Sequence, residues 1–208
     1  SKPANVKLKN IEVHQCNYLW DIIKLIGVSI NDDFQKLENS NVADYTHVKM
    51  ANPEKEVITF IGDGSYLLYN SDIYSSVITD NKLIIIVCDN GGHAVINRLQ
   101  LFKGGKEFNC LFESSKNTNL LGVNFAQHAA SMGAKSEEVS SISELEEAFK
   151  RAKKSKVTYV ISIKTHSYQW LEGSAYWESP TLEIPTTKEN KEALKLHNEG
   201  KAKQRQGV

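Results

Sequence analysis

The sequence predicts an α/β protein with a doubly wound, mostly parallel sheet and helices on both faces. Apolar runs typical of strands buried on both sides recur at residues 57–61, 83–88 and 157–163. Segments with helical spacing separate these runs, and strands that alternate with helices form parallel sheets. Glycine-bearing turns follow the first two runs directly, as expected where a strand passes into a helix.

Composition limits the classes of protein to which the chain can belong. Its 208 residues are enough for one α/β domain or two small ones, and 25 acidic and 25 basic residues leave no net charge. The lack of a basic excess argues against nucleic-acid binding. Three cysteines without a CxxC pair favour a reducing compartment. No apolar run reaches the roughly 18 residues of a membrane span, and no signal-peptide pattern is present. We therefore expect a cytoplasmic protein without a membrane partner.

The chain is expected to divide into three segments. Residues 1–41 form a partly ordered lead-in, in which the apolar spacing at 19–28 fits either a buried helix or a strand. Residues 42–185 form the α/β domain. Residues 186–208 are highly charged and predict a surface helix and tail.

The centre of the domain lies between Val57 and Asn90. A strand, a tight loop, a helix and a second strand are expected there, at 57–61, 62–65, 69–78 and 83–88. Because a crossover connection makes the two strands parallel, their C-terminal ends lie side by side. Ligands of open α/β sheets bind outside such ends. Asp63 and Asn90, 27 positions apart, are therefore expected to face each other.

The residue types at these two ends suggest a metal and a phosphate. Carboxylate and amide oxygens such as those of Asp63 and Asn90 suit Mg²⁺ or Ca²⁺. Gly64 and Ser65 lead into a helix whose first N–H groups favour an anion. A simpler interpretation is open for each residue: Asp63 as a turn residue, Asn90 as a loop residue, and Ser65 as a helix cap.

The remaining elements follow from periodicity and capping. Helices are expected at 93–101 and 124–132, the second stopped by Gly133, and a short strand at 134–139. Ser143 and Glu146 predict a capping box for a helix that ends near Lys154. Residues 103–119 form a long polar loop, and loops of this length are often functional.

Several short stretches resemble a known family. Gly62-Asp63-Gly64, 24 residues and then Asp89-Asn90 resemble the diphosphate-binding signature of thiamin diphosphate enzymes. The wider pattern resembles the C-terminal cofactor domain of the acetolactate synthase-like superfamily, and within it the trihydroxycyclohexane-1,2-dione hydrolases of myo-inositol catabolism. The stretches that carry this second resemblance are Val48-Lys49-Met50-Ala51, Ser65-Tyr66-Leu67, Ile96-Asn97-Arg98-Leu99-Gln100 and Glu107-Phe108.

The resemblance implies thiamin diphosphate and Mg²⁺ as cofactors. Its metal ligands would be Asp63, Asn90 and the backbone carbonyl of Gly92. The residues implied at the cofactor are Gly62, Gly64, Ser65, Gly91 and His93. Glycines at 91 and 92 allow close backbone approach, while His93 is either an acid–base group or a structural residue.

The resemblance also implies partners. The activating glutamate of the family lies on a separate pyrimidine-binding domain of the same or a partner subunit, and Glu12 and Glu38 lack that setting. We therefore expect a homo-oligomeric parent enzyme that opens a small-molecule cyclic 1,2-diketone by C–C hydrolysis, with this chain alone not catalytic and its catalytic residues unknown. The alternatives are an acetolactate synthase-like carboligase or decarboxylase, or a degenerate assembly domain. Large polar residues at 44–47, where relatives have small ones, motivate the last.

Other candidate residues carry weaker signals. His128 lies among small apolar residues and is expected in the core, whereas His166 follows a strand end and could approach the site. Aromatic residues at Tyr168, Trp170, Tyr176 and Trp177 are expected either to pack against a domain or to form a C-terminal flap.

Overall fold

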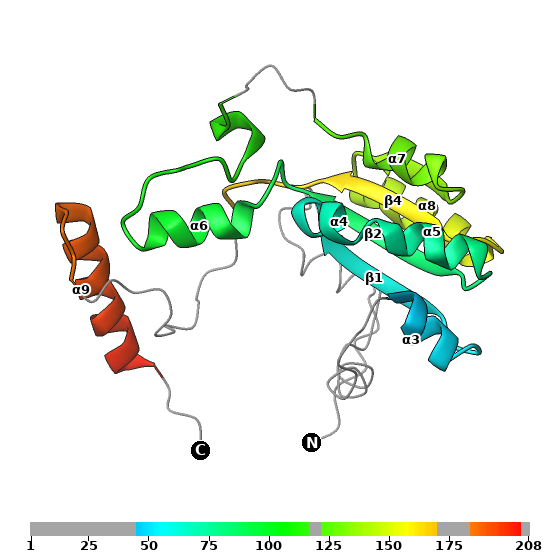
Figure 1. Cartoon of the computed structure of the whole chain (residues 1–208), viewed down its shortest axis with the longest axis horizontal. Coiled ribbons are helices and arrows are strands. Elements are labelled where there is room, and N and C mark those ends of the chain that lie inside the picture. Colours follow the sequence, from blue (N-terminus) through cyan, green and yellow to red (C-terminus); the bar gives the residue numbers. More distant parts are fainter. Residues whose placement is uncertain (1–44, 117–121, 170–183, 205–208) are drawn as a thin grey trace. The chain divides into compact units, whose positions relative to one another are not determined.

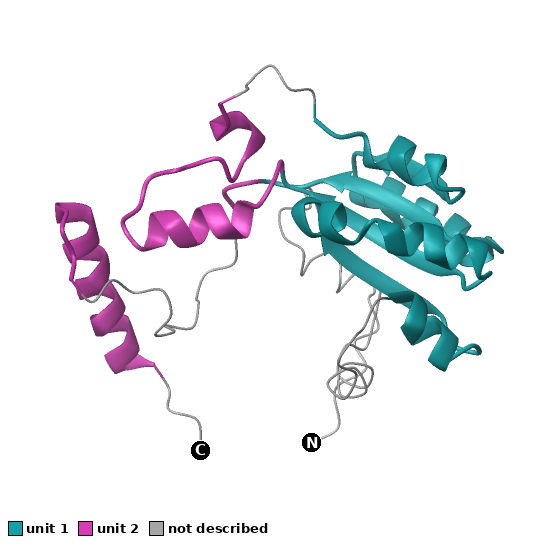
Figure 2. Cartoon of the chain, in the orientation of Figure 1, with its two compact units in different colours: residues 1–90, 121–166 teal, residues 91–120, 167–208 magenta. Residues whose placement is uncertain are grey.

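The computed structural model describes residues 45–116, 122–169 and 184–204 (Figure 1). The expectations for the lead-in 1–41, for Asp44, and for Trp170, Tyr176 and Trp177 lie outside these ranges. The chain divides into two compact units (Figure 2). Unit 1 comprises Ser1–Asn90 and Leu121–His166, and unit 2 comprises Gly91–Leu120 and Ser167–Val208. Each unit is described by itself below.

Unit 1 is built on a four-stranded parallel sheet. Its strands stand in the order β1-β2-β4-β3, and every neighbouring pair is parallel. Their bounds are β1 (Val57–Gly62), β2 (Leu83–Asp89), β3 (Lys135–Val139) and β4 (Tyr159–Lys164). The parallel α/β sheet predicted from the apolar runs is confirmed.

Helices cover both faces of this sheet, as Figure 1 shows. The chain moves in one direction from β1 to β2 and on to β3, then returns to place β4 between β2 and β3. Because crossovers are right-handed, a reversal of direction sends the next helix to the opposite face. The helices of unit 1 are α3 (Tyr45–Ala51), α4 (Asp63–Tyr69), α5 (Ser71–Ile78), α7 (Phe125–Ser131) and α8 (Ile142–Lys154).

Strand β2 shows how the two faces are separated. All seven of its residues are buried, and successive side chains of a strand point to opposite faces. Leu83, Ile85 and Val87 pack with residues of α4, α5 and α7. The alternate residues, Ile84, Ile86 and Cys88, pack with residues of α8. The doubly wound arrangement is therefore visible in the burial of a single strand.

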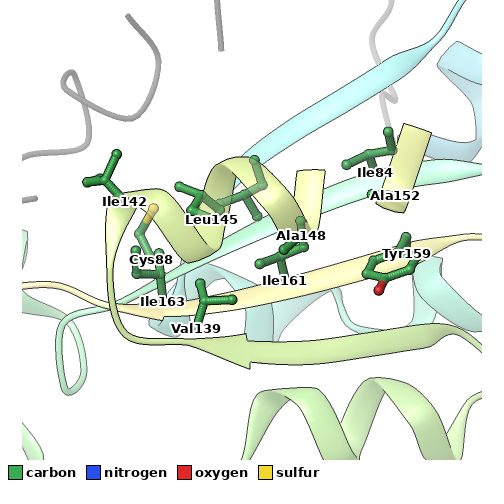
Figure 3. Close-up of a cluster of buried hydrophobic side chains, with 11 residues drawn as sticks. Ile84, Cys88, Val139, Ile142, Leu145, Ala148, Ala152, Tyr159, Ile161 and Ile163 are labelled. Carbon is green, nitrogen blue, oxygen red and sulfur yellow. The ribbon is translucent and has the colours of Figure 1, made fainter. Parts of the chain in front are cut away.

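The face under α8 is packed mostly by aliphatic side chains, together with Cys88 and the ring of Tyr159 (Figure 3). Helix α8 turns Ile142, Leu145, Ala148 and Ala152 toward the sheet, at helical spacing. The two alanines are fully buried. Because their side chains are short, the helix lies close against the strands.

The opposite face is packed by shorter helices and carries aromatic residues. Tyr66 of α4 and Phe125 of α7 meet edge to face, with ring centroids 5.1 Å apart. Both are almost fully buried. The hydroxyl of Tyr66 hydrogen-bonds Nδ1 of His128 at 2.9 Å, and burial raises the pKa of Tyr66 to about 12. His128 is half-buried, so its predicted place in the core is only partly realised.

Helix α3 is anchored to this face by a carboxylate of α5. Buried Asp72 accepts the backbone N–H groups of Tyr45 and Thr46, at 2.7 and 3.1 Å, and also the hydroxyl of Thr46. Thr46 is 3 % exposed, and Tyr45 packs against the apolar cluster. The large residues at 45–47 are thus accommodated by a folded helix whose N-terminus is satisfied from another element.

The helix predicted at 69–78 is present as α5 (Ser71–Ile78). The tight loop predicted at 62–65 is wrong from Asp63 onward, because α4 begins there with Gly62 as its N-cap and no side-chain capping bond, so Ser65 is not the cap. Helix α8 begins at Ile142, where Ser141 accepts the N–H of Glu144. The Glu144 carboxylate accepts from the N–H of Ser140. The N-cap is therefore Ser141 rather than Ser143, and the glutamate reaches back to the residue before the N-cap, so the predicted capping box is wrong.

Strand β3 forms one edge of the sheet and is charged. Its sequence, Lys-Ser-Glu-Glu-Val, leaves Lys135 and Glu138 exposed. Glu137 accepts two hydrogen bonds from the Arg151 guanidinium, at 3.0 and 2.6 Å, and one from the Tyr159 hydroxyl. These hydrogen bonds, that of Arg151 first, hold the pKa of Glu137 below its ordinary value.

Unit 2 contains helix α6 (Ala94–Phe102), the short 3₁₀ helix η1 (Phe112–Ser114) and helix α9 (Lys188–Lys203). The start of α9 lies against the residues that follow α6. The Asn190 amide donates to the carbonyls of Lys103 and Gly104. A Cβ at Gly104 would lie 2.5 Å from the Glu189 carbonyl oxygen, so only glycine permits this approach.

The predicted helices at 93–101, 124–132 and 186–206 correspond to α6, α7 and α9 within a few residues. The polar loop after α6 is partly ordered by η1. Among the helices that the structure describes, none is long and apolar enough to cross a membrane.

Candidate functional site

The two strand ends expected to form the site are neighbours. Strands β1 and β2 pair in parallel with Gly62 opposite Cys88, and paired strands lie roughly 4.8 Å apart. Asp63 and Asn90 follow these ends by one and two residues. Asp63 is 1 % exposed and Asn90 is half-buried. The predicted adjacency of the strand ends is confirmed, while the role of the two side chains stays a prediction.

Asp63 occupies the first position of α4. A carboxylate there is favoured by the helix dipole, and it stands where the sheet gives way to the helix. Gly64 is also buried, whereas Ser65 is exposed. Gly62 has no atom near the position that a Cβ would take, so the turn does not require glycine there for reasons of space.

An ion pair between buried Asp89 and exposed Lys164, next to Asn90, is the feature that the sequence analysis missed. Asp89 is 3 % exposed, and its carboxylate pairs with the ammonium of Lys164 at the end of β4. The Asp89 carbonyl accepts the Thr165 N–H at 2.8 Å. The Asp89 carboxylate is therefore engaged with the neighbouring strand. Only the apolar strand before Lys164 hinted at this contact, because it placed the lysine at a strand end.

Unit 2 carries the glycines predicted beside the cofactor. Gly91 and Gly92 have φ angles of +81° and +135°, which favour glycine. Gly92 forms an isolated antiparallel bridge with Leu111. A Cβ at Gly92 would lie 2.4 Å from the Cys110 carbonyl oxygen. Gly92 therefore cannot be replaced by a larger residue without moving the segment at 110–111.

The hydrogen bonds of this bridge bear on the predicted metal ligand. His93 donates its N–H to Cys110, and Phe112 donates to the carbonyl of Gly91. The bridge thus engages the Gly91 carbonyl. The role of Gly92 as a backbone ligand stays a prediction.

His93 and His166, the two histidines considered for the site, are both exposed and belong to different units. His93 is exposed and stands at the N-cap position of α6 without a side-chain capping bond. His166 is exposed at the end of unit 1. Neither the acid–base nor the structural interpretation of His93 is decided by these contacts.

The donor types present fit a hard divalent cation. The described residues contain no group of three or more His, Cys, Asp or Glu side chains arranged to hold a metal. The predicted site uses instead one carboxylate, one amide and one carbonyl, which suits Mg²⁺ with further ligands from phosphate and water. Buried Asp63 at a parallel strand end, followed by a helix, is also where a diphosphate binds in such folds. The residues present therefore fit the implied group.

An open cavity of about 570 Å³ lies elsewhere in unit 1, beside β3, β4 and α8. Its lining is strongly charged and includes Glu137, Glu144, Arg151 and Lys164. No residue predicted for the cofactor site lines it.

Comparison with known protein families decides the class of the domain. The family of thiamine pyrophosphate enzymes, C-terminal TPP binding domain, matches residues 45–163. This range covers more than half of the chain and contains the sheet of unit 1 except Lys164, the last residue of β4. The chain belongs to this family. Its resemblance to thiamin diphosphate enzymes and the predicted fold are thereby confirmed.

Curated relatives of this chain share a more specific name than that of the family. A 3D-(3,5/4)-trihydroxycyclohexane-1,2-dione hydrolase of Bacillus licheniformis is 29 % identical over 185 residues, which cover 80 % of this chain and 29 % of that protein. A 3D-(3,5/4)-trihydroxycyclohexane-1,2-dione hydrolase 2 of Bacillus cereus is 35 % identical over 142 residues, covering 65 % and 22 %. The chain thus spans about a quarter of the length of these relatives.

A solved structure supports the fold. The thiamine diphosphate-dependent 4-hydroxybenzoylformate decarboxylase of Rhodococcus jostii superposes with a TM-score of 0.52 and 21 % sequence identity. The match covers 59 % of this chain and 22 % of that one. At this identity the likeness concerns the architecture alone.

Proposed function

We propose that the chain is the diphosphate- and Mg²⁺-binding domain of a thiamin diphosphate-dependent C–C hydrolase that opens a cyclic 1,2-diketone in myo-inositol catabolism. The observation that supports the binding role is the parallel pairing of β1 with β2, whose neighbouring ends are followed by buried Asp63 and by Asn90. The names of the relatives support the reaction. When bound, thiamin diphosphate supplies the nucleophilic carbon that cleaves a bond next to a carbonyl.

The residues of this chain have separate roles in the proposal. The oxygens of Asp63, Asn90 and the Gly92 carbonyl would hold Mg²⁺. The backbone at Gly62, Gly64, Ser65 and Gly91 would contact the diphosphate, with His93 beside it. Lys164 would keep the Asp89 carboxylate neutralised, because an unpaired buried charge next to the diphosphate would repel it.

Titration calorimetry with thiamin diphosphate, with and without Mg²⁺, tests the binding role. We expect Mg²⁺-dependent binding that Asp63→Ala abolishes and Asn90→Ala weakens at least about tenfold, since each removes a metal ligand. Glu146→Ala, which removes an exposed carboxylate of α8, is the matched control and should bind as the unmodified chain does. Equal binding by the Asp63 variant would show that the site is wrong.

Partners are part of the proposal. Exposed apolar side chains gather on three helices of unit 1, where they are unusual for a monomer surface. We propose that they meet the pyrimidine-binding domain that provides the activating glutamate, in a homo-oligomeric, cytoplasmic parent enzyme, and that this chain alone is not catalytic. The residues concerned are Met50 of α3, Leu67, Leu68 and Tyr69 of α4, and Tyr74 and Ile78 of α5.

A further inference from the structure

Three lysines of unit 1 lie together at the edge of the sheet opposite the candidate site. Lys82 directly precedes β2, and Glu56 directly precedes β1, whereas the predicted metal ligands follow the other ends of these strands. Lys49 belongs to α3 and Lys153 to the last turn of α8. Both act electrostatically on Lys82, so three distant segments bring their ammonium groups close together. We refer to Lys49, Lys82 and Lys153 as the lysine cluster.

A single carboxylate faces this cluster. Oε1 of Glu56 lies 3.8 Å from Nζ of Lys82, and Oε2 lies 3.5 Å from Nζ of Lys153. Both distances exceed the roughly 2.7–2.9 Å of a charge-assisted hydrogen bond, so the carboxylate is not bound tightly to either lysine. Among the described residues, no other acidic side chain is paired with the cluster. Three ammonium groups and one carboxylate leave an excess of two positive charges.

Backbone carbonyls hold two of the ammonium groups in place. Nζ of Lys49 donates to the carbonyls of Pro53 and Lys55, at 2.7 and 2.6 Å. Nζ of Lys82 donates to the carbonyl of Lys153 at 3.0 Å. An ammonium group has three N–H donors, so each of these lysines keeps at least one for a ligand. Because their positions are already fixed, little side-chain freedom is lost when a ligand binds.

Mutual repulsion and access to solvent both favour an added anion. Burial lowers the pKa of Lys82, Glu56 opposes this shift, and the ammonium groups of Lys49 and Lys153 add to it. An anion among the three lysines would relieve that repulsion. Lys153 and Glu56 are exposed and Lys82 is partly exposed, so a small molecule can reach the cluster from solvent.

A phosphate dianion matches the excess charge of the cluster. Phosphate presents several oxygens, and lysine ammonium groups bind it as compact point charges. A ligand with one carboxylate would neutralise only half of the excess. A nucleic acid is disfavoured, because its binding surfaces are extended basic stripes and this chain has no net charge. The cluster therefore fits a single phosphate group rather than a polymer.

We propose that Lys49, Lys82 and Lys153 form an anion site that binds a phosphate dianion, either free or as the monoester of a small metabolite. The bound phosphate would join α3, the residue before β2 and the end of α8. This site is separate from the predicted metal and diphosphate residues, and it does not depend on the function proposed above.

The test follows the backbone amide signals of the full 208-residue chain by NMR while inorganic phosphate replaces chloride at constant ionic strength. We expect saturable shifts near the cluster, and Lys82→Met and Lys153→Met should each weaken binding at least about fivefold. Lys150→Met, which removes an exposed lysine of α8 paired with Glu147, is the control and should bind as the unmodified chain does. A parallel titration with glucose 6-phosphate distinguishes a monoester, which would bind more tightly, from free phosphate.

Removal of the carboxylate should have the opposite effect on binding. Glu56→Gln keeps the size of the side chain and leaves the lysines without their compensating charge. The melting temperature without phosphate should therefore fall, while phosphate should bind about threefold more tightly and restore stability. Because Glu56 is exposed, this variant keeps the test valid if a lysine variant does not fold.

Several results would overturn the site. These are the absence of saturable shifts, shifts that both lysine variants retain, an equal loss in Lys150→Met, and weaker binding in Glu56→Gln. Asp63→Ala should leave the phosphate-induced shifts in place, and their loss would show that phosphate binds at the predicted metal site instead. Thiamin diphosphate binding by the lysine variants should be unchanged, so failure of this site and failure of the proposed function are distinguishable.

Discussion

The two faces of the unit 1 sheet are packed in different ways. Within the described residues, one face is covered by the single long helix α8, with mostly aliphatic side chains and two buried alanines. The other face is covered by α4, α5 and α7. Its packing includes aromatic rings and side-chain hydrogen bonds between elements, such as Tyr66–His128 and Asp72–Thr46. Gly62-Asp63-Gly64 forms the N-cap and start of α4, which lies on this second face. The comparison suggests that the α8 face supplies stability, whereas the second face holds site-bearing elements in place.

The largest effect should come from the α8 face. Leu145→Ala removes a side chain that is 1 % exposed and should lower the free energy of unfolding by about 3 kcal/mol, because a cavity remains in a tightly packed layer. Urea denaturation measures this loss, and Glu146→Ala on the exposed side of α8 is the control. Thiamin diphosphate binding by the folded variant should be unchanged. A loss below about 1 kcal/mol would contradict the division of roles between the faces.

A smaller loss is expected where α5 holds α3. Asp72→Ala leaves the N–H groups of Tyr45 and Thr46 without their acceptor and should cost about 2 kcal/mol. Hydrogen exchange should show the loss locally, as faster exchange in α3 with β2 still protected. Ser75→Ala removes a hydroxyl of α5 that bonds within its own helix, to the Ser71 carbonyl, and should leave both measurements nearly unchanged. Uniform loosening of the whole sheet would show that Asp72 does more than anchor α3.

The hydrogen bond between Tyr66 of α4 and His128 of α7 should contribute still less to the free energy of unfolding. Tyr66→Phe keeps the ring in place and removes the hydrogen bond to His128, at a cost of about 1 kcal/mol. Its effect on pH dependence is more specific. The pKa of Tyr66 rises from 10.0 to about 12 on folding, so its contribution is complete below pH 10 and is lost as pH rises toward 12. Thermal melts across this range should show a slope that Tyr66→Phe reduces.

The smallest effect on stability is expected from Glu137, on the edge strand β3 beside α8. The pKa of Glu137 is held below 4.5 by its partners, so its contribution is present above pH 4.5 and disappears as pH falls through the lowered value. Glu137→Gln should flatten the acid side of the stability profile slightly, because solvent screens the pair with Arg151. Melting temperatures between about pH 3 and 6 measure this. An unchanged acid slope would show that the pair contributes nothing.

The elements predicted from the sequence were those that depend on local patterns. Apolar runs located all the long strands, and Gly62-Asp63-Gly64 with Asp89-Asn90 located both strand ends of the site. Helix α4 was missed because Gly-Asp-Gly is ordinary turn chemistry and was assigned to a tight loop. In the folded chain Asp63 is already helical, with Gly62 as the N-cap.

Contacts between residues far apart in the chain could not be predicted from sequence patterns. Asp72 satisfies N–H groups that lie 26 and 27 positions earlier, and Lys164 pairs with Asp89 across 75 positions. No local period encodes such pairs, because they depend on which strands become neighbours. The order β1-β2-β4-β3 alone brings the end of β4 beside Asp89.

The charged strand β3 has a consequence for growth of the sheet. An incoming strand would have to lie beside Lys135 and Glu138, whose side chains are exposed, and such edges resist further strand pairing. A continuous intermolecular sheet is therefore disfavoured along this margin, and with it the fibrillar route to aggregation. Copies of the domain that associate must then do so through side chains rather than through backbone pairing at β3.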